Sequence, residues 1–167
     1  AKQLLADAGY PNGFTFEAVC ANSASATQIA EAVAAQLEQV GVHVKIRPVD
    51  NSTVTFYTNK ESDAWIGPWG GRADPALTLS LQYTKDKLQN PGGTASDVIE
   101  ADAAAALVPG TEQERTPAVQ AFTGQVLKEN LDVFLFFNDL VQVHAADVTG
   151  VTNWVTAKPS FSGVIKK

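Results

Sequence analysis

The chain has 167 residues, of which 45% are hydrophobic, 18 are acidic and 12 are basic, giving a formal net charge of −6. This composition is typical of one globular domain, or of one lobe of a larger protein. Lysine and arginine are scattered singly apart from Lys166 and Lys167. That distribution argues against a nucleic-acid partner or a polybasic membrane patch.

Targeting and membrane signals do not appear in the sequence. No apolar run approaches the roughly 20 residues of a membrane-spanning helix. No signal peptide is recognisable, and the chain starts without methionine in a helix-like segment. We therefore expect a piece of a longer protein.

Metal and cofactor chemistry finds no support in the sequence. Cys20 is the single cysteine, so neither an intrachain disulfide nor a CxxC pair can form. It lies in an apolar alternation, which favours a buried, inert thiol. His43 and His144 lie far apart in separate strand-like runs, and neither has a second ligand at metal spacing. We expect no metal site and no cofactor.

The first half of the chain has the pattern of a βαβ unit. Residues 2–8 favour a short helix, and residues 14–20 alternate as in a strand. Ser25 and Gln28 match a capping box that opens a helix reaching the glycine at position 41. Residues 42–49 alternate again. Short connections between strand, helix and strand predict two parallel strands with a crossover helix.

A third strand is expected after a short helix. The helix near 52–60 has either Asp50 or Ser52 as its cap. Residues 63–67, DAWIG, read as the strand, and Pro68 ends it because proline cannot donate to a ladder.

Helices dominate the next part of the chain. Helices are expected near 75–83 and over 96–107. Thr111 with Glu114 offers one start for the following helix, as a capping box. Pro117 would lie uncomfortably deep in a helix that started there. The prediction is therefore a short turn and then a helix from Pro117 to about residue 130.

Two further strands are expected near the C-terminus. Residues 133–137, VFLFF, form a continuous apolar run, as in a strand covered on both faces. Residues 140–145 alternate and are a candidate for another strand. The remaining residues have weak periodicity.

No catalytic signature is present. The nucleophile elbow, the HExxH motif and the P-loop are all missing. Asp63 and Asp74 flank the stretch WGGRADP (69–75) and could form a carboxylate pair. Asp74 is better explained as a helix N-cap with Pro75 at the first helical position. Without a triad or a metal set, we expect that the protein is not an enzyme.

The order of these elements resembles the C-terminal lobe of the family 5 extracellular solute-binding proteins, the peptide, nickel and opine receptors of ABC importers. The stretches that carry the resemblance, in chain order, are AKQLLADAGYPNGFTF, IAEAVAAQLEQVGVHVKI, SDAWIGPWGGRADP, ERTPAVQAFTGQVLKENLDVFLFF and VTGV. Together these stretches run in order over nearly the whole chain.

The resemblance implies a periplasmic-binding-protein type II lobe, α/β, with a mostly parallel central sheet and helices on both faces. It implies a parent roughly three times longer, in which 1–145 form the ligand-binding lobe and 146–167 return to the other lobe. The residues of that return segment expected to expose apolar surface are Trp154, Val155, Phe161, Val164 and Ile165.

The resemblance also implies a function and partners. The parent would capture a peptide or other small polar solute, anionic solutes included, outside the cytoplasmic membrane, as a bacterial lipoprotein in the periplasm or at the cell surface. Its partners would be the ligand, the N-terminal lobe of the same chain and the ABC permease subunits, with no nucleic acid. The alternative is an extracytoplasmic sensory or regulatory module of the same fold.

The stretch WGGRADP is the expected ligand loop. Ligands of open parallel α/β sheets bind outside the carboxyl ends of the strands, where this stretch and the loops 21–26 and 49–52 should lie. Trp69 either walls the ligand pocket or packs at a lobe edge that the other lobe covers. Gly70 and Gly71 either allow unusual backbone angles or donate their amides to the ligand.

Arg72 is the most informative residue of the loop. Peptide-binding members of the family place an acidic residue near this position, for the α-amino group of the ligand. An arginine instead favours a carboxylate or phosphate partner through bidentate hydrogen bonds. The other interpretation is an internal ion pair with Asp63 or Asp74.

Overall fold

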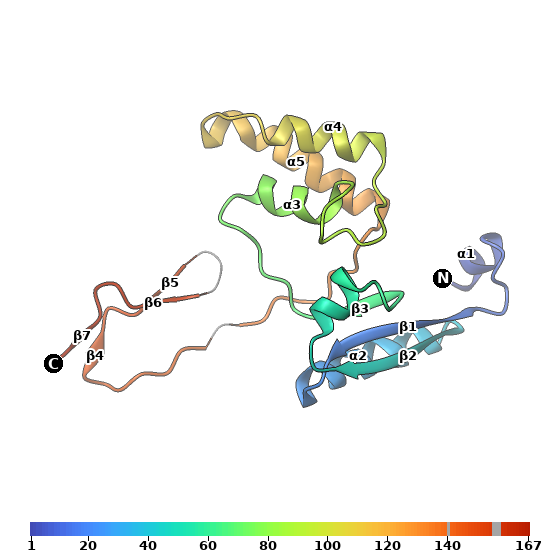
Figure 1. The fold of residues 1–167 in the computed structure, drawn as a ribbon, viewed down its shortest axis with the longest axis horizontal. Helices are drawn as coiled ribbons and strands as arrows, with labels where there is room; N and C mark the ends of the chain where they lie inside the picture. The colour runs from blue at the N-terminus through green and yellow to red at the C-terminus, as the bar shows by residue number, and fades with distance from the viewer. Residues whose placement is uncertain (140, 155–157) are drawn as a thin grey trace. The chain divides into compact units, whose positions relative to one another are not determined.

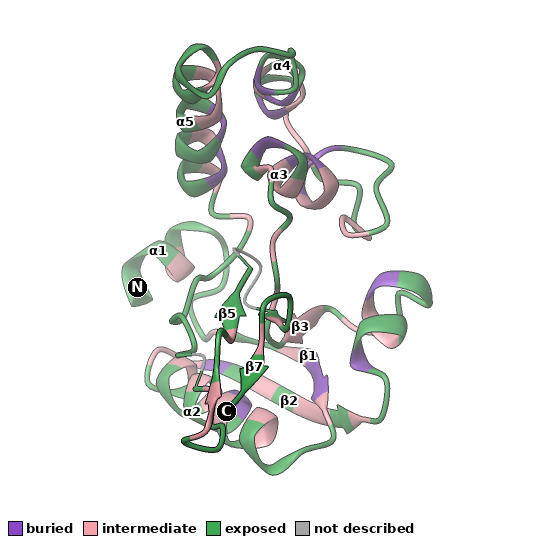
Figure 2. Cartoon of the chain, turned by 90° about the vertical axis from the view of Figure 1, so that its left-hand side faces the viewer, coloured by how far each residue is buried: buried purple, intermediate pink, exposed green. Residues whose placement is uncertain are grey.

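The computed structural model describes residues 1–139, 141–154 and 158–167 (Figure 1). The chain divides into two compact units, Ala1–Trp69 and Gly70–Lys167. Each unit has its own hydrophobic residues buried among its own elements (Figure 2).

The first unit is an α/β structure built on a parallel sheet. Its elements are α1 (Lys2–Asp7), β1 (Phe14–Ala21), α2 (Ala24–Glu38), β2 (Val42–Val49), the π-helix η1 (Val54–Thr58) and β3 (Ala64–Ile66). The strand order is β2-β1-β3, and both strand pairs are parallel. The predicted βαβ unit and third strand are therefore confirmed.

The core of the first unit lies around the central strand. Ala18, Val19 and Cys20 of β1 are completely buried, and Ala30 of α2 is buried as well. Consecutive strand residues point to opposite faces, so the burial of three in a row shows that β1 is covered on both sides. Cys20 is a buried free thiol, as its apolar surroundings in the sequence predicted.

Two of the predicted helix caps in this unit are wrong by one or two residues. Ser23, with an extended backbone, is the N-cap of α2 and accepts from the Ala26 amide, which leaves Ser25 inside the first turn. The Oδ1 of Asn51 accepts from the Val54 amide, so neither predicted residue caps the next helical segment. In both cases several polar residues adjoin the helix, and the backbone conformation decides which one caps it.

The second unit begins with three helices. These are α3 (Pro75–Tyr83), α4 (Asp97–Ala106) and α5 (Glu112–Glu129). Their buried core consists of Ala76, Tyr83, Ile99, Ala103, Ala106, Phe122 and Val126. Two short antiparallel pairs follow: β4 (Val148–Thr149) with β7 (Ile165–Lys166), and β5 (Thr152–Asn153) with β6 (Pro159–Ser160).

The predicted start of α5 at Pro117 is wrong. The helix begins at Glu112, and Thr111 and Glu114 form the complete capping box. Pro117 lies inside the helix, where it deprives the carbonyl of Gln113 of its usual donor. Both residues are exposed, so water can hydrate that carbonyl. The capping box therefore prevails over the cost of the proline.

The strand expected over 133–137 is not formed. The strand expected over 140–145 is not formed at 141–145 either, and Leu140 lies outside the described residues. Residues 133–137 are between 48% and 97% exposed. An apolar run reports a need for burial, but a strand also needs a neighbouring strand to accept its hydrogen bonds. Within the described chain, these residues have no ladder partner.

The C-terminal segment also exposes apolar side chains. Trp154, Phe161 and Ile165 are each more than 60% exposed, and Val164 is half-buried. Val155, which we expected to behave in the same way, lies outside the described residues.

Candidate functional site

The carboxyl ends of the three parallel strands lie at one edge of the first unit. In the register of the sheet, Ala21 pairs with Val49 and Cys20 pairs with Ile66. Just past this edge the Asn22 amide donates to the Val49 carbonyl at 3.0 Å. The loops 21–26 and 49–52 therefore lie together, as the parallel sheet predicted.

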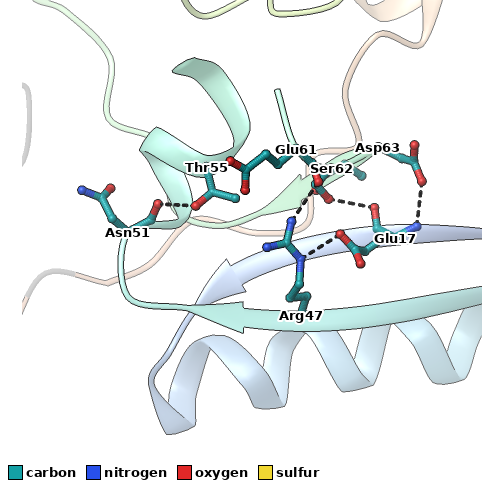
Figure 3. A network of polar contacts seen from close by, with 8 residues as sticks. Glu17, Arg47, Asn51, Thr55, Glu61, Ser62 and Asp63 are labelled. Carbon is teal, nitrogen blue, oxygen red and sulfur yellow. Dashed lines mark hydrogen bonds and ion pairs between the residues drawn. The ribbon is translucent and has the colours of Figure 1, made fainter. Parts of the chain in front are cut away.

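A polar network anchors β3 to β1 before the strand begins (Figure 3). Asp63 accepts from the Glu17 amide at 2.9 Å, and Ser62 donates to the Glu17 carbonyl at 3.0 Å. Arg47 of β2 donates to the Glu17 carboxylate and to the Glu61 carbonyl, both at 2.8 Å. The network holds an edge strand of only three residues in register, and it engages the carboxylate of Asp63.

The end of β3 is organised around Trp65. Its indole nitrogen donates to the buried Ser52 hydroxyl at 3.1 Å, and its ring lies 5.5 Å from that of Tyr57. A side chain at Gly67 would overlap the Trp65 indole. The chain can thus turn away after β3 only because position 67 lacks a Cβ. Trp69, two residues on, is half-buried and ends the first unit.

In the second unit, Thr78 holds the backbone of Arg72. The Arg72 amide donates to the Thr78 hydroxyl at 2.7 Å, and that hydroxyl lies 3.0 Å from the Asp74 carbonyl. Asp74 is the N-cap of α3, accepting from the amides of Ala76 at 2.8 Å and Leu77 at 3.3 Å. The residues before α3 are therefore tied to its first turn.

Asp74 has a second role that the sequence did not suggest. Arg115 of α5 lies 2.8 Å from its carboxylate and also donates to the Ala106 carbonyl at 3.1 Å. Partial burial raises the pKa of Asp74, but the hydrogen bonds from Arg115 and from the Leu77 and Ala76 amides hold the pKa below its ordinary value. The ion pair joins the ends of three helices.

One alternative for Arg72 was an internal ion pair with Asp63 or Asp74. The Asp74 carboxylate pairs with Arg115 instead. Within the described part of the second unit, no carboxylate lies within ion-pair distance of the exposed Arg72 guanidinium.

The four predicted ligand residues are divided between the two units. Trp69 is the last residue of the first unit, and Gly70, Gly71 and Arg72 open the second. Gly70 and Arg72 are exposed and Gly71 is half-buried.

Among the described side chains, no group of three or more His, Cys, Asp or Glu is arranged to hold a metal ion. The helices of the described ranges include none long and apolar enough to cross a membrane.

Comparison with known proteins identifies the family. The model of the family described as "Bacterial extracellular solute-binding proteins, family 5 Middle" matches residues 1–90, which is more than half of the chain. The chain belongs to family 5 of the bacterial extracellular solute-binding proteins. The matched region includes the whole parallel sheet, the WGGRADP stretch and α3.

Relatives with established names match nearly the whole chain. Glutathione-binding protein GsiB from Salmonella typhimurium is 28% identical over 174 residues, covering 97% of this chain and 34% of that protein. Its namesake from Escherichia coli K12 is 27% identical with the same coverage. The chain therefore spans about a third of the length of these relatives.

Solved structures show the same fold. HbpA2 from Haemophilus parasuis has a TM-score of 0.72 and 21% identity, over 99% of this chain and 34% of that chain. The dipeptide binding protein from Pseudoalteromonas sp. SM9913, in complex with Met-Leu, has a TM-score of 0.70 and 19% identity, over 99% and 35%. The fold is that of a lobe of a type II periplasmic binding protein, as the sequence pattern of family 5 implied.

The sequence patterns did not predict the roles of Thr78, Arg115 and Trp65. Thr78 and Arg115 hold the residues before α3, and Trp65 organises the end of β3. A local signal for Thr78 is present in the sequence. Thr78 follows the Asp74-Pro75 helix start by one turn, where a threonine hydroxyl can form a hydrogen bond to the preceding loop. Arg115 is 41 residues from Asp74, and no periodicity connects positions so far apart. The contact of Trp65 with Ser52 is likewise tertiary.

Proposed function

We propose that this chain forms one lobe of the substrate-binding component of an ABC importer, which captures a peptide or other small polar solute outside the cytoplasmic membrane. The family match over residues 1–90 carries the proposal. Two relatives support a peptide-like ligand: one is named glutathione-binding, and one was solved with Met-Leu. Such a protein binds and releases its solute unchanged, so no catalytic group is required.

The rest of the parent protein supplies the second lobe. This chain spans 34% of the relatives' length, which leaves ample chain for it. In this proposal, 1–145 contribute to the ligand-binding lobe and 146–167 return to the other lobe. The exposed Trp154, Phe161 and Ile165 support an uncovered surface there. The parent is held outside the membrane, as a lipoprotein, and delivers its solute to the permease subunits.

The ligand contacts in this proposal come from residues 69–72. Trp69 stacks on an apolar part of the solute, and the amides of Gly70 and Gly71 donate to its acceptors. Arg72 receives a carboxylate, because its guanidinium is exposed and the nearby Asp74 is already paired with Arg115. Glutathione and dipeptides such as Met-Leu carry the carboxylate that this interaction needs.

Native mass spectrometry of the full-length receptor tests the ligand class. The purified receptor is expected to retain a peptide or another small solute bearing a carboxylate. A sugar retained in stoichiometric amount, with no binding of added peptides, would contradict the proposal.

Arg72→Ala in the full-length receptor tests the anionic contact. Loss of a desolvated charge partner should weaken binding of the retained solute by about 2–4 kcal/mol. Lys87→Ala, which removes another exposed positive charge of the second unit, is the control and should leave the affinity unchanged. Calorimetry that gives equal affinities for wild type and Arg72→Ala would rule out this role for Arg72.

A further inference from the structure

The hydroxyl of Thr78 has a geometry that fixes its direction. A helical threonine hydroxyl can donate to the carbonyl four residues earlier, and Thr78 does so to Asp74 at 3.0 Å. The Arg72 carbonyl lies farther away, at 3.4 Å, and the hydroxyl has only one proton to give. With its proton directed at Asp74, the oxygen presents a lone pair to the Arg72 amide at 2.7 Å.

The carbonyl to which Thr78 donates belongs to a residue that is itself held from three sides. The Asp74 side chain accepts from the Ala76 and Leu77 amides and pairs with Arg115 at 2.8 Å. Arg115 in turn donates to the last turn of α4. A continuous chain of contacts therefore runs from α4 and α5, through Asp74 and Thr78, to the backbone of Arg72.

We propose that Thr78 is a positioning residue for ligand binding: its hydroxyl fixes the backbone from which the Arg72 side chain extends. This rests on the proposed function of Arg72. Ordering a backbone segment when the ligand binds costs free energy and so reduces affinity. Fixing the Arg72 backbone before the ligand arrives removes that backbone cost, as supporting contacts do in binding sites generally. Thr78 itself makes no contact with the ligand in this role.

Three substitutions in the full-length receptor separate positioning from general stability. Thr78→Val keeps the branched shape and removes the hydroxyl, whereas Thr78→Ser keeps the hydroxyl. Thr123→Val is the matched control. Thr123 makes the same hydroxyl contact to a carbonyl four residues earlier, at 2.8 Å, but within α5 and away from the loop.

The first measurement is hydrogen exchange at the Arg72 amide, which requires no ligand. In Thr78→Val this amide should exchange faster, while the amides within α3 keep their protection. Thr78→Ser should exchange as wild type does, and so should Thr123→Val. Unchanged exchange at Arg72 in Thr78→Val would overturn the proposal.

The second measurement is affinity for glutathione and for Met-Leu. Loss of one hydrogen bond should weaken binding of the recognised probe roughly threefold to tenfold in Thr78→Val, with recovery in Thr78→Ser. An affinity of Thr78→Val equal to wild type would overturn the ligand-positioning role. If the wild type binds neither probe nor any other peptide, the proposed function fails, whereas the exchange experiment still decides whether Thr78 holds Arg72.

Discussion

Asp74 shows how one residue serves two purposes. Its carboxylate caps α3 and also receives Arg115 from α5. The sequence predicted the cap, because capping depends on a short local pattern of Asp, Pro and a following helix. The ion pair depends on how α3 and α5 pack, which the local pattern does not contain.

Asp74→Asn isolates the charge from the cap, since asparagine caps helices about as well as aspartate. The pKa of Asp74 is lowered in the folded protein, so its charge stabilises the fold at pH values above the unfolded pKa, about 4. That contribution is lost as the pH falls through the folded pKa. We expect wild type to be the more stable protein near neutral pH and the difference to shrink in acid.

Urea denaturation of both proteins near neutral pH and below the carboxyl range measures this difference. Glu31→Gln, which neutralises an exposed carboxylate, is the control and should change stability little at either pH. A gap between Asp74→Asn and wild type that is the same at both pH values would show that the charge of Asp74 does not contribute.

Gly67 and Gly70 provide a matched pair at the residue scale. An added Cβ at Gly67 would overlap the Trp65 ring, while a Cβ at Gly70 meets nothing within 4 Å. Gly67→Ala should therefore destabilise the chain by about 1–3 kcal/mol through overpacking, and Gly70→Ala should have little effect. Thermal unfolding compares the two, and equal melting temperatures would contradict the packing described around Trp65.

At the scale of elements, the start of α5 decides between two helix-start signals that lie close together in the sequence. The capping box at Thr111 and the Thr116-Pro117 pair both predict a start, and the structure uses the first. The hydroxyl of Thr116 then bonds the Glu112 carbonyl inside the helix. The low helix propensity of proline argued against a start before Pro117. The cost of that proline depends on whether water can reach the Gln113 carbonyl, which the sequence does not show.

Alanine substitutions decide between the two starts. Thr111→Ala should cost about 1 kcal/mol of stability, the usual cost of losing an N-cap, whereas Thr116→Ala should cost less. Chemical denaturation measures both. A larger loss for Thr116→Ala than for Thr111→Ala would mean that the helix begins at Pro117 after all.

At the scale of the whole molecule, the sequence predicted the sheet well and the region after α5 poorly. The strands β1, β2 and β3 have local signals, and the helix between β1 and β2 forces a parallel pairing. Residues 133–137 carry an equally clear apolar signal but remain exposed and unpaired in the described chain. Their need for burial is readable from the sequence, but the local pattern does not specify which residues would pair with them or cover them.

The candidate site follows the same division. The carboxyl edge of the sheet, where Ala21 pairs with Val49, and the Asp74-Pro75 helix start follow from local patterns. The contacts that shape it do not, because Thr78 reaches back to the loop and Arg115 reaches across from another helix. The proposed ligand site, if shared with a second lobe as we propose, would depend on still more distant residues.

Calorimetric titration of the full-length receptor and of residues 1–167 alone, with glutathione and Met-Leu, tests the central claim most directly. Closure of two lobes around the solute supplies much of the affinity in receptors of this kind. We therefore expect the full-length receptor to bind a peptide probe and the chain alone to show no measurable binding. Equal affinity for the chain alone, or binding of neither these nor any other peptide by the full-length receptor, would contradict the account.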